Sequence, residues 1–367
     1  MDDGFRAAQG RGGDWQEACS VCIRQLGGLS ASANLGFVYA NGPLAGALDL
    51  IVAGLREATG IGAWIGTGGA GVCASGEEYV EGGALVTLAA SLPEDSFRVF
   101  DSTGGPAPGA PLPQGGASCG VVHGDPRQPD IAAAIAHLSV DSGAFLVGGL
   151  SSADGGALQI AGRAAEGALS GVLFGGEVEI VTGLSQGCTP VAPAHEVTAS
   201  QGPWLFTLDG HPAVDVLKAD IGEVLARNLE RIGGFIHVAL PTAGADRPDY
   251  VVRNLLAIDL RRGAIAVADV LRPGDQVMFV KRDGTGAQAD LRRMLDDLRR
   301  RTAGRPIRGA LYHSCVARGP HMFGPDSAEL RMIERALGPV PLAGFLANGE
   351  IFRDRLYSYS GVLTLFL

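Results

Sequence analysis

Two charged residues near the C-terminus have the greatest potential for chemistry. Arg318 and Glu350 each follow an apolar stretch and lie in a glycine-flanked segment, where an unpaired charge would be costly to desolvate. One interpretation is a buried ion pair that joins two loops. The other is that Arg318 grips a ligand carboxylate with its bidentate guanidinium while Glu350 accepts a hydrogen bond from a ligand amine. The sequence leaves both interpretations open.

Cys315 is the candidate nucleophile. It lies three positions before Arg318, with His313 and His321 close in sequence, and a thiol of lowered pKa could attack a small metabolite in acyl or amidine chemistry. Cysteine is also among the residue types most often buried, and the sequence reveals no base geometry. We therefore expect a binding protein with no catalytic residue, and keep an enzyme acting through Cys315 as the alternative.

Cys19 and Cys22 have the spacing of a metal or redox pair. A metal site needs a second pair, and a thioredoxin-like motif follows a strand rather than preceding one. Residues 14–26 have helical periodicity, so a separation of three places both thiols on one buried face. We predict no metal site and no cofactor.

Glycines and neutral polar residues gather where the predicted strands end. The chain has 56 glycines in 367 residues, about twice the usual ~7% share. Such loops let backbone approach a ligand, and strand ends are where open α/β sheets bind ligands, although a plain turn explains any single loop as well. The predicted ligand-binding residues are Asn41, Gly66, Thr67, Gly69, Gly149, Ser151, Ser152, Cys315, Arg318, Gly319, Asn348, Gly349 and Glu350.

The loop at residues 66–71 matches neither familiar phosphate-binding signature. No Lys follows its glycines, as a Walker-type loop requires, and residues 72–81 indicate a bend toward another strand rather than the helix of a dinucleotide fold. Nucleotide binding is therefore disfavoured.

Composition excludes several classes of protein. A hydrophobic share of 46% indicates a globular chain. The net charge of −10 argues against nucleic-acid binding. The apolar runs are too short to span a bilayer, and the N-terminus lacks the features of a signal peptide. Six scattered cysteines agree with a reducing compartment. We expect a cytoplasmic protein that contacts neither nucleic acid nor membrane.

A repeated unit organises the chain. In each copy an amphipathic helix leads to an apolar strand, a small-residue loop and a second apolar strand. The copies occupy residues 45–88, 130–174 and 327–366, and a possible fourth relative occupies residues 290–319. Residues 1–15 resemble a frayed tail, and residues 101–116, rich in proline and glycine, a surface loop.

This repetition predicts an α/β fold of two related lobes with mixed sheets and flanking helices. A break near residues 192–210 sets the boundary between the lobes. We therefore expect an N-terminal tail and helix at residues 1–30, one α/β domain at 31–209 and a second at 210–367.

Several blocks of the sequence resemble the FIST and FIST C-terminal sensory domains, from about Asn34 to Leu367. Their order and spacing carry the resemblance. They are LGFVYAN at 35–41, WIGT at 64–67, VGGLSS at 147–152, QGCTP at 186–190, LDGHPA at 208–213, SCVARG at 314–319, PLAGF at 341–345 and NGEI at 348–351.

The resemblance implies a sensor of small ligands, with amino acids or related metabolites as the ligand class. Relatives are often fused to kinase, cyclase or chemoreceptor outputs, whereas this chain ends inside its last predicted strand. We therefore expect signalling through a separate protein partner, with homo-oligomer formation left open. Some relatives are described as haem-binding nitric-oxide sensors. Because the sequence has no Cys-x-x-Cys-His attachment motif, a haem-based gas sensor is only an alternative.

Overall fold

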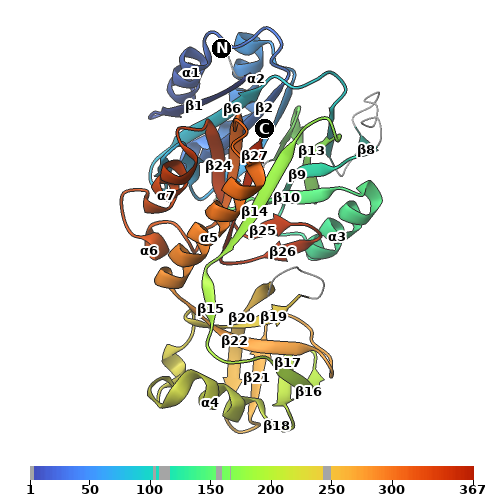
Figure 1. Cartoon of the computed structure of the whole chain (residues 1–367), viewed down its shortest axis with the longest axis vertical. Coiled ribbons are helices and arrows are strands. Elements are labelled where there is room, and N and C mark those ends of the chain that lie inside the picture. The colour runs from blue at the N-terminus through green and yellow to red at the C-terminus, as the bar shows by residue number, and fades with distance from the viewer. Residues whose placement is uncertain (1–3, 102–104, 107–115, 154–158, 166, 243–248) are drawn as a thin grey trace. The chain divides into compact units, whose positions relative to one another are not determined.

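The chain folds into two compact units. The computed structural model describes residues 4–101, 105–106, 116–153, 159–165, 167–242 and 249–367. Unit 1 comprises Met1–Ser185 and Gln288–Leu367, and unit 2 comprises Gln186–Ala287. Unit 2 therefore interrupts unit 1 in sequence (Figure 1).

Unit 1 consists of three copies of one β/α repeat. Repeat 1 contains β1 (Phe5–Arg11), α1 (Trp15–Leu26), β2 (Leu35–Asn41), η1 (Gly42–Ala47), α2 (Leu48–Thr59), β3 (Ala63–Gly69), β4 (Val72–Ala74), β5 (Glu77–Tyr79) and β6 (Ala84–Ala90). Repeat 2 contains β7 (Phe97–Asp101), β8 (Gly105–Pro106), β9 (Cys119–Gly124), α3 (Ile131–Ser142), β10 (Phe145–Leu150), β11 (Gln159–Ala161), β12 (Ala164–Ala165) and β13 (Leu169–Phe174). Repeat 3 contains β14 (Ile180–Gln186), α5 (Gly284–Thr302), β23 (Gly309–Cys315), α6 (Pro320–Phe323), α7 (Ala328–Leu337), β24 (Leu342–Ala347), β25 (Glu350–Phe352), β26 (Arg355–Tyr357) and β27 (Ser360–Phe366).

Each repeat builds one sheet around a parallel pair of strands. The pairs are β2 with β3, β9 with β10, and β23 with β24. Parallel neighbours need a crossover connection, which α2, α3 and α7 provide. The three crossover helices end at glycines with positive φ, namely Gly60 (74°), Gly143 (68°) and Gly338 (84°), a conformation that glycine adopts without steric cost.

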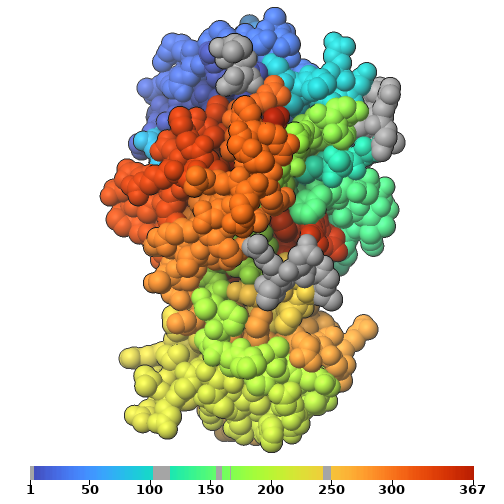
Figure 2. Space-filling model, in the orientation of Figure 1, coloured from blue at the N-terminus to red at the C-terminus, as the bar shows by residue number. Residues whose placement is uncertain are grey.

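The repeats exchange hairpins in a cycle. The hairpin β4–β5 of repeat 1 joins β24 of repeat 3, β25–β26 of repeat 3 joins β10 of repeat 2, and β11–β12 of repeat 2 joins β3 of repeat 1. As a result the three sheets have equivalent strand orders: β1-β6-β2-β3-β11-β12, β8-β7-β13-β9-β10-β25-β26 and β14-β27-β23-β24-β4-β5. In the space-filling view, blue residues of repeat 1 and red residues of repeat 3 form one continuous body (Figure 2).

Three equivalent glycines allow this close packing of strands. A Cβ atom on Gly66 would lie 1.7 Å from the carbonyl oxygen of Val38, and the corresponding distances are 1.9 Å at Gly148 and 1.8 Å at Gly344. Each glycine lies inside a strand. The expectation that these glycines belong to loops beyond the strands is therefore wrong, because their role is to bring neighbouring strands together.

Unit 2 is a β-barrel with a flanking helix. Its elements are β15 (Cys188–Pro190), β16 (His195–Gln201), β17 (Trp204–Leu208), β18 (His211–Pro212), α4 (Ala213–Ala226), η2 (Leu229–Arg231), β19 (Ile236–Pro241), β20 (Tyr250–Asp259), β21 (Ala264–Val267) and β22 (Gln276–Arg282). Strands β16, β17, β21, β20, β19 and β22 pair in turn, and β22 pairs back with β16, which closes the barrel. Val197, Leu205, Val238 and Phe279 belong to its buried core.

The predicted mixed sheets, flanking helices and repeated units are confirmed. The repeats all lie in unit 1, however, because the exchanged hairpins join all three copies into one body. The segment at residues 290–319, taken as a possible fourth copy, forms the helix α5 and the strand β23 of repeat 3. The compact units do not divide the chain between residues 209 and 210. The predicted boundary there therefore stays a prediction about the sequence domains. Most of the predicted loop at 101–116 falls outside the described residues.

The N-terminal segment differs from the expected frayed tail. Strand β1 pairs with β6 along seven residues, and Phe5 packs in the main core. The polar residues Arg6, Gln9 and Arg11 suggested a tail, whereas the strand packs on both faces, with Phe5 and Ala7 on one core cluster and Ala8 on another.

Substituting alanine for Gly344 tests the close approach of strands. We expect Gly344→Ala to destabilise the protein by about 2–4 kcal/mol, because the new methyl group overlaps backbone that cannot move without breaking the sheet. Gly176→Ala is the matched control, since a Cβ there meets no atom within 4 Å. Urea denaturation measures both variants, and equal stability of the two would contradict the packing role.

Candidate functional site

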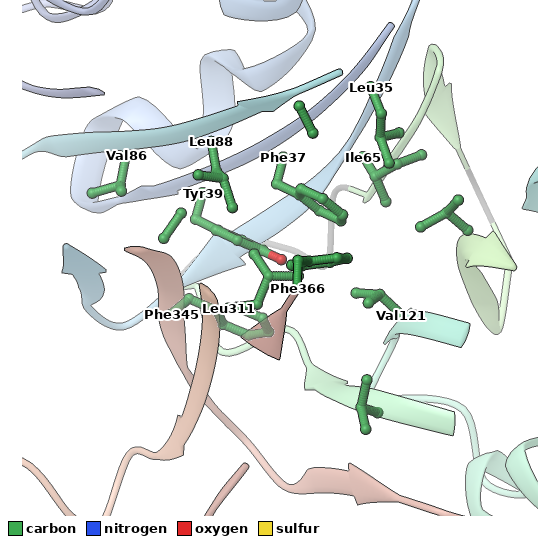
Figure 3. Close-up of a cluster of buried hydrophobic side chains, with 14 of the residues drawn as sticks. Leu35, Phe37, Tyr39, Ile65, Val86, Leu88, Val121, Leu311, Phe345 and Phe366 are labelled. Carbon is green, nitrogen blue, oxygen red and sulfur yellow. The ribbon is translucent and has the colours of Figure 1, made fainter. Parts of the chain in front are cut away.

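The three repeats meet at three equivalent side chains. Tyr39, His123 and His313 occupy the same position in β2, β9 and β23, paired respectively with Thr67, Gly149 and Phe345 on the parallel neighbour. The Tyr39 hydroxyl lies 3.1 Å from Nε2 of His123 and 3.3 Å from Nε2 of His313. Figure 3 shows Tyr39 pointing into the junction between the sheets, with Phe345 beside it.

Burial holds the two histidines neutral. Burial lowers the pKa of His313 to about 3. Burial also lowers the pKa of His123 well below its usual range, and the nearby His313 lowers it further. The Tyr39 hydroxyl can both donate and accept hydrogen bonds, so it can serve both Nε2 atoms at once. The Nδ1 atoms of both lack a hydrogen-bond partner among the described residues. This centre is a structural junction.

The predicted loops converge on one edge of unit 1. Ser151 Oγ donates to the carbonyl oxygen of Gly68 at 2.9 Å, and the amide of Ala70 donates to Ser152 Oγ at 2.8 Å. Ser152 Oγ also donates to the carbonyl oxygen of Leu346. These bonds connect the strand ends of repeats 1, 2 and 3.

The remaining loops join the same edge through hydrogen bonds between backbone amides and carbonyl oxygens. The amide of Leu150 donates to Gly349 at 2.9 Å, and the amide of Asn348 donates to Leu150 at 3.0 Å. The amide of Val316 donates to Ala347 at 3.0 Å, which brings in the segment after β23. Much of the hydrogen-bonding capacity of these loops is therefore used by the loops themselves.

A depression of about 520 Å³ lies where β2 and β3 end. Its lining residues are Asn41, Gly42, Pro43, Gly69, Ala70, Val80 and Gly82. The Asn41 side chain holds the rim in place. Its Nδ2 donates to the carbonyl oxygen of Tyr79 at 3.0 Å, and its Oδ1 accepts from the amide of Ala84 at 2.7 Å. The carboxyl ends of parallel strands are the usual place for a ligand in α/β folds.

The predicted residues divide between this depression and the packed interior. Asn41 and Gly69 line the depression. Gly66, Thr67 and Gly149 are buried inside strands, whereas Asn348 is exposed. Gly349 has a φ of 116° between β24 and β25.

Arg318 pairs with Glu329 rather than with Glu350. Its Nε and Nη2 atoms donate to Glu329 Oε1 at 2.8 and 2.6 Å, and both side chains are fully buried. Ser185 accepts two further hydrogen bonds from Arg318, and the ring of Phe323 lies beneath the guanidinium at 4.8 Å. Of the two interpretations left open by the sequence, the ion pair with Glu350 is wrong, because Glu329 of α7 is the carboxylate that pairs with Arg318. Glu329 also occupies the guanidinium fork that the other interpretation gave to a ligand.

Gly319 belongs to the same buried network. Its amide donates to Glu329 Oε2 at 3.3 Å, and Tyr312 and Ser314 of β23 donate to the same carboxylate at 2.6 and 3.2 Å. The Glu78 carboxyl faces Gly319, so a Cβ there would lie 3.3 Å from Glu78 Oε2. Burial and the neighbouring Glu329 raise the pKa of Glu78 to about 7.

Glu350 is a buried acid without an ion-pair partner among the described residues. Its Oε2 accepts from the amide and hydroxyl of Ser360 at 3.1 and 2.6 Å, while Oε1 has no hydrogen-bond partner in the described part of the chain. Burial raises the pKa of Glu350 to about 8, although the bonds from Ser360 oppose this. The Glu350 side chain therefore keeps its proton to a higher pH than an ordinary carboxyl group.

Cys315 lies close enough to Glu350 to feel its charge. Burial together with the Glu350 charge raises the pKa of Cys315 above its usual range, and the side chain is 6% exposed. A nucleophile needs the opposite change. Cys19 and Cys22 are buried on one face of α1, as expected.

Tyr39, His123 and Glu329 were not among the residues predicted from the sequence, and His313 was considered only as a neighbour of Cys315. Tyr39 and the two histidines could have been found by extending each repeat one strand earlier, since LGFVYAN at 35–41, CGVVHGD at 119–125 and GALYHSC at 309–315 align residue for residue. No feature of the sequence pointed to Glu329, because the sequence of a helix does not indicate which distant arginine a glutamate will pair with.

The described residues contain neither a metal-binding cluster nor a membrane-spanning helix. No group of three or more His, Cys, Asp or Glu side chains there is placed to hold a metal ion. No helix in the described ranges is long and apolar enough to cross a membrane.

Fold and site together define a mixed α/β protein with a glycine-lined depression at converging strand ends. Comparison with known families is more specific. The FIST N domain matches residues 34–211 and the FIST C domain matches residues 213–353. The chain therefore belongs to the FIST family, whose domains are generally sensory domains of signal transduction.

Curated relatives come from mycobacteria. An uncharacterized protein of Mycobacterium tuberculosis is 34% identical over 200 residues, which is 51% of each chain. An uncharacterized protein of Mycobacterium bovis is 34% identical over 197 residues, or 50% of each chain. The match thus spans about half the length of these relatives.

Replacing Glu350 with glutamine tests its protonation. The native state holds a proton that the unfolded chain releases above its ordinary pKa of 4.5, so wild-type stability falls as pH rises from there to about 8. Glu350→Gln removes this loss. Its stability relative to wild type should rise with pH by up to about 1.4 kcal/mol per unit, as measured by urea denaturation at pH 5 to 8. A difference that stays constant with pH would refute the assignment.

Replacing Glu329 should destabilise the protein. Glu329→Gln leaves the charge of Arg318 buried and uncompensated, so we expect a loss of about 3–5 kcal/mol. Glu223→Gln, which removes an exposed pair with Arg227, is the control and should change stability by less than about 0.5 kcal/mol. Thermal denaturation compares them, and a mild effect at Glu329 would argue against the buried pair.

Proposed function

We propose that the protein is a small-molecule sensor whose ligand binds in the depression at the ends of β2 and β3. The observation that carries the proposal is the coincidence of this depression with the edge where loops from all three repeats meet. The sensory character of FIST domains supports it. Of the residues predicted from sequence, Asn41 and Gly69 are the proposed direct contacts.

The lining favours a small polar ligand with a short apolar part. It contains no charged side chain among the residues that form it, and Pro43 and Val80 add apolar surface. Backbone amides and Asn41 would meet the polar groups. An amino acid or related metabolite suits this surface, because its charged ends can face backbone dipoles and water.

The proposed signal passes through the interlocked loops. Ala70 borders the depression, and its amide is bonded to Ser152, which in turn bonds to Leu346. A ligand that displaces Ala70 would change contacts with repeats 2 and 3, so occupancy would alter the packing of the whole edge. A separate signalling protein, or a second copy of the chain, would read this change.

The proposed location is the cytoplasm. All six cysteines are free and buried, an arrangement that suits a reducing compartment.

A thermal-shift screen against amino acids and related metabolites tests the proposal. A true ligand at 100 times its dissociation constant should add ~2.7 kcal/mol of stability. Val80→Lys places a long charged chain in the depression and should abolish the ligand-induced shift while leaving the basal melting temperature nearly unchanged, since Val80 is 40% exposed.

Val140→Lys is the matched control. Val140 lies in α3 and is 79% exposed, so this variant should respond to ligand as wild type does. A ligand that stabilises Val80→Lys as strongly as Val140→Lys would bind elsewhere, and absence of any stabilising metabolite would favour an adaptor without a ligand.

A further inference from the structure

Unit 2 contains a histidine held between two carboxylates. His195 of β16 lies with Nδ1 2.6 Å from Asp209 Oδ2 and with Nε2 2.9 Å from Asp220 Oδ2. Asp209 belongs to the turn between β17 and β18, and Asp220 belongs to α4. One imidazole ring thus connects three elements of the unit.

This geometry determines the protonation state. A carboxylate can only accept hydrogen bonds, so both contacts are hydrogen bonds only when both ring nitrogens carry a proton. A neutral imidazole has one N–H, and its other nitrogen would present a lone pair to a carboxylate. The double contact therefore requires the imidazolium form.

The two arms of the contact are not equivalent. The Asp209 side chain is 47% exposed, and its other oxygen accepts from the amide of Glu196 at 2.8 Å, so it is held without His195. The Asp220 side chain is 12% exposed, and His195 is its only hydrogen-bond partner among the described residues. Gly222, two residues later, interrupts α4 with a φ of 79°. Losing the Asp220 arm would free a helix that already has a break.

We propose that His195 is a proton-operated latch that fastens α4 to β16 when protonated and releases it when neutral. His195 and Asp209 lie within the FIST N match, and Asp220 lies within the FIST C match. The latch therefore couples the two sequence domains of the family inside one compact unit, and gives the protein a response to pH that is independent of the proposed ligand site.

The electrostatic surroundings agree with this assignment. Burial by itself lowers the pKa of His195, but the hydrogen bonds to Asp209 and Asp220 outweigh it, so that the pKa is raised above the ordinary 6.5. His211 acts on Asp209 from the neighbouring strand, and Glu196 is the charged neighbour on β16. A raised pKa in the folded state means that the latch stabilises fully below the ordinary value and is lost as pH rises through the raised one.

Histidine NMR and hydrogen exchange on the full chain test the latch. With 13Cε1-labelled histidine, the His195 resonance is identified by its absence in His195→Gln, and its pKa should exceed 6.5 in the wild type and fall in Asp220→Asn. Amide protection of α4, corrected for intrinsic exchange, should decrease between pH 6 and pH 8, by up to about tenfold per unit of raised pKa. In Asp220→Asn the protection should be low at both pH values.

Two variants keep the test decisive. Glu223→Gln changes an exposed carboxylate of the same helix and should leave both the His195 pKa and the pH response unchanged. Should Asp220→Asn fail to fold, Asp209→Asn weakens the exposed arm and should still lower the His195 pKa. The proposal is overturned if His195 titrates at or below the ordinary value, or if α4 loses protection equally in wild type and Asp220→Asn.

Discussion

The meeting of three strands at Tyr39, His123 and His313 is the constraint on which unit 1 depends. A hydroxyl that both donates and accepts lets two imidazoles share it, and burial keeps both imidazoles neutral. A charge at this point would have no counter-ion among the described residues within the junction. Because each repeat contributes one of the three groups, the junction is complete only when all three sheets are in register.

Hairpin exchange follows from the same arrangement. A sheet built by one repeat ends at its second parallel strand, and the next repeat covers that exposed edge with its own hairpin. The cycle closes after three copies, so no repeat can complete its sheet alone. The glycine at the equivalent position of each parallel strand makes the necessary close approach sterically possible.

Buried charge is treated differently at two neighbouring positions. Arg318 is neutralised by Glu329 and surrounded by further donors and acceptors, so it serves as an anchor for the segment after β23. Glu350 accepts hydrogen bonds on Oε2 only, and burial raises its pKa. The candidate ligand site uses neither group, because the depression at the ends of β2 and β3 is lined by neutral residues.

The sequence by itself determined the local structure and the family: the periodicity of residues 14–26 predicted α1, the repeated helix-strand pattern predicted the α/β class, and the order and spacing of the sequence blocks indicated the FIST family. It could not determine which carboxylate meets Arg318, or that hairpins cross between repeats. Those outcomes depend on contacts between residues far apart in the chain, such as Val72 with Phe345. Periodicity and turn chemistry report only on neighbours along the sequence, so the partner of a buried charge and the destination of a hairpin are decided when the sheets pack together.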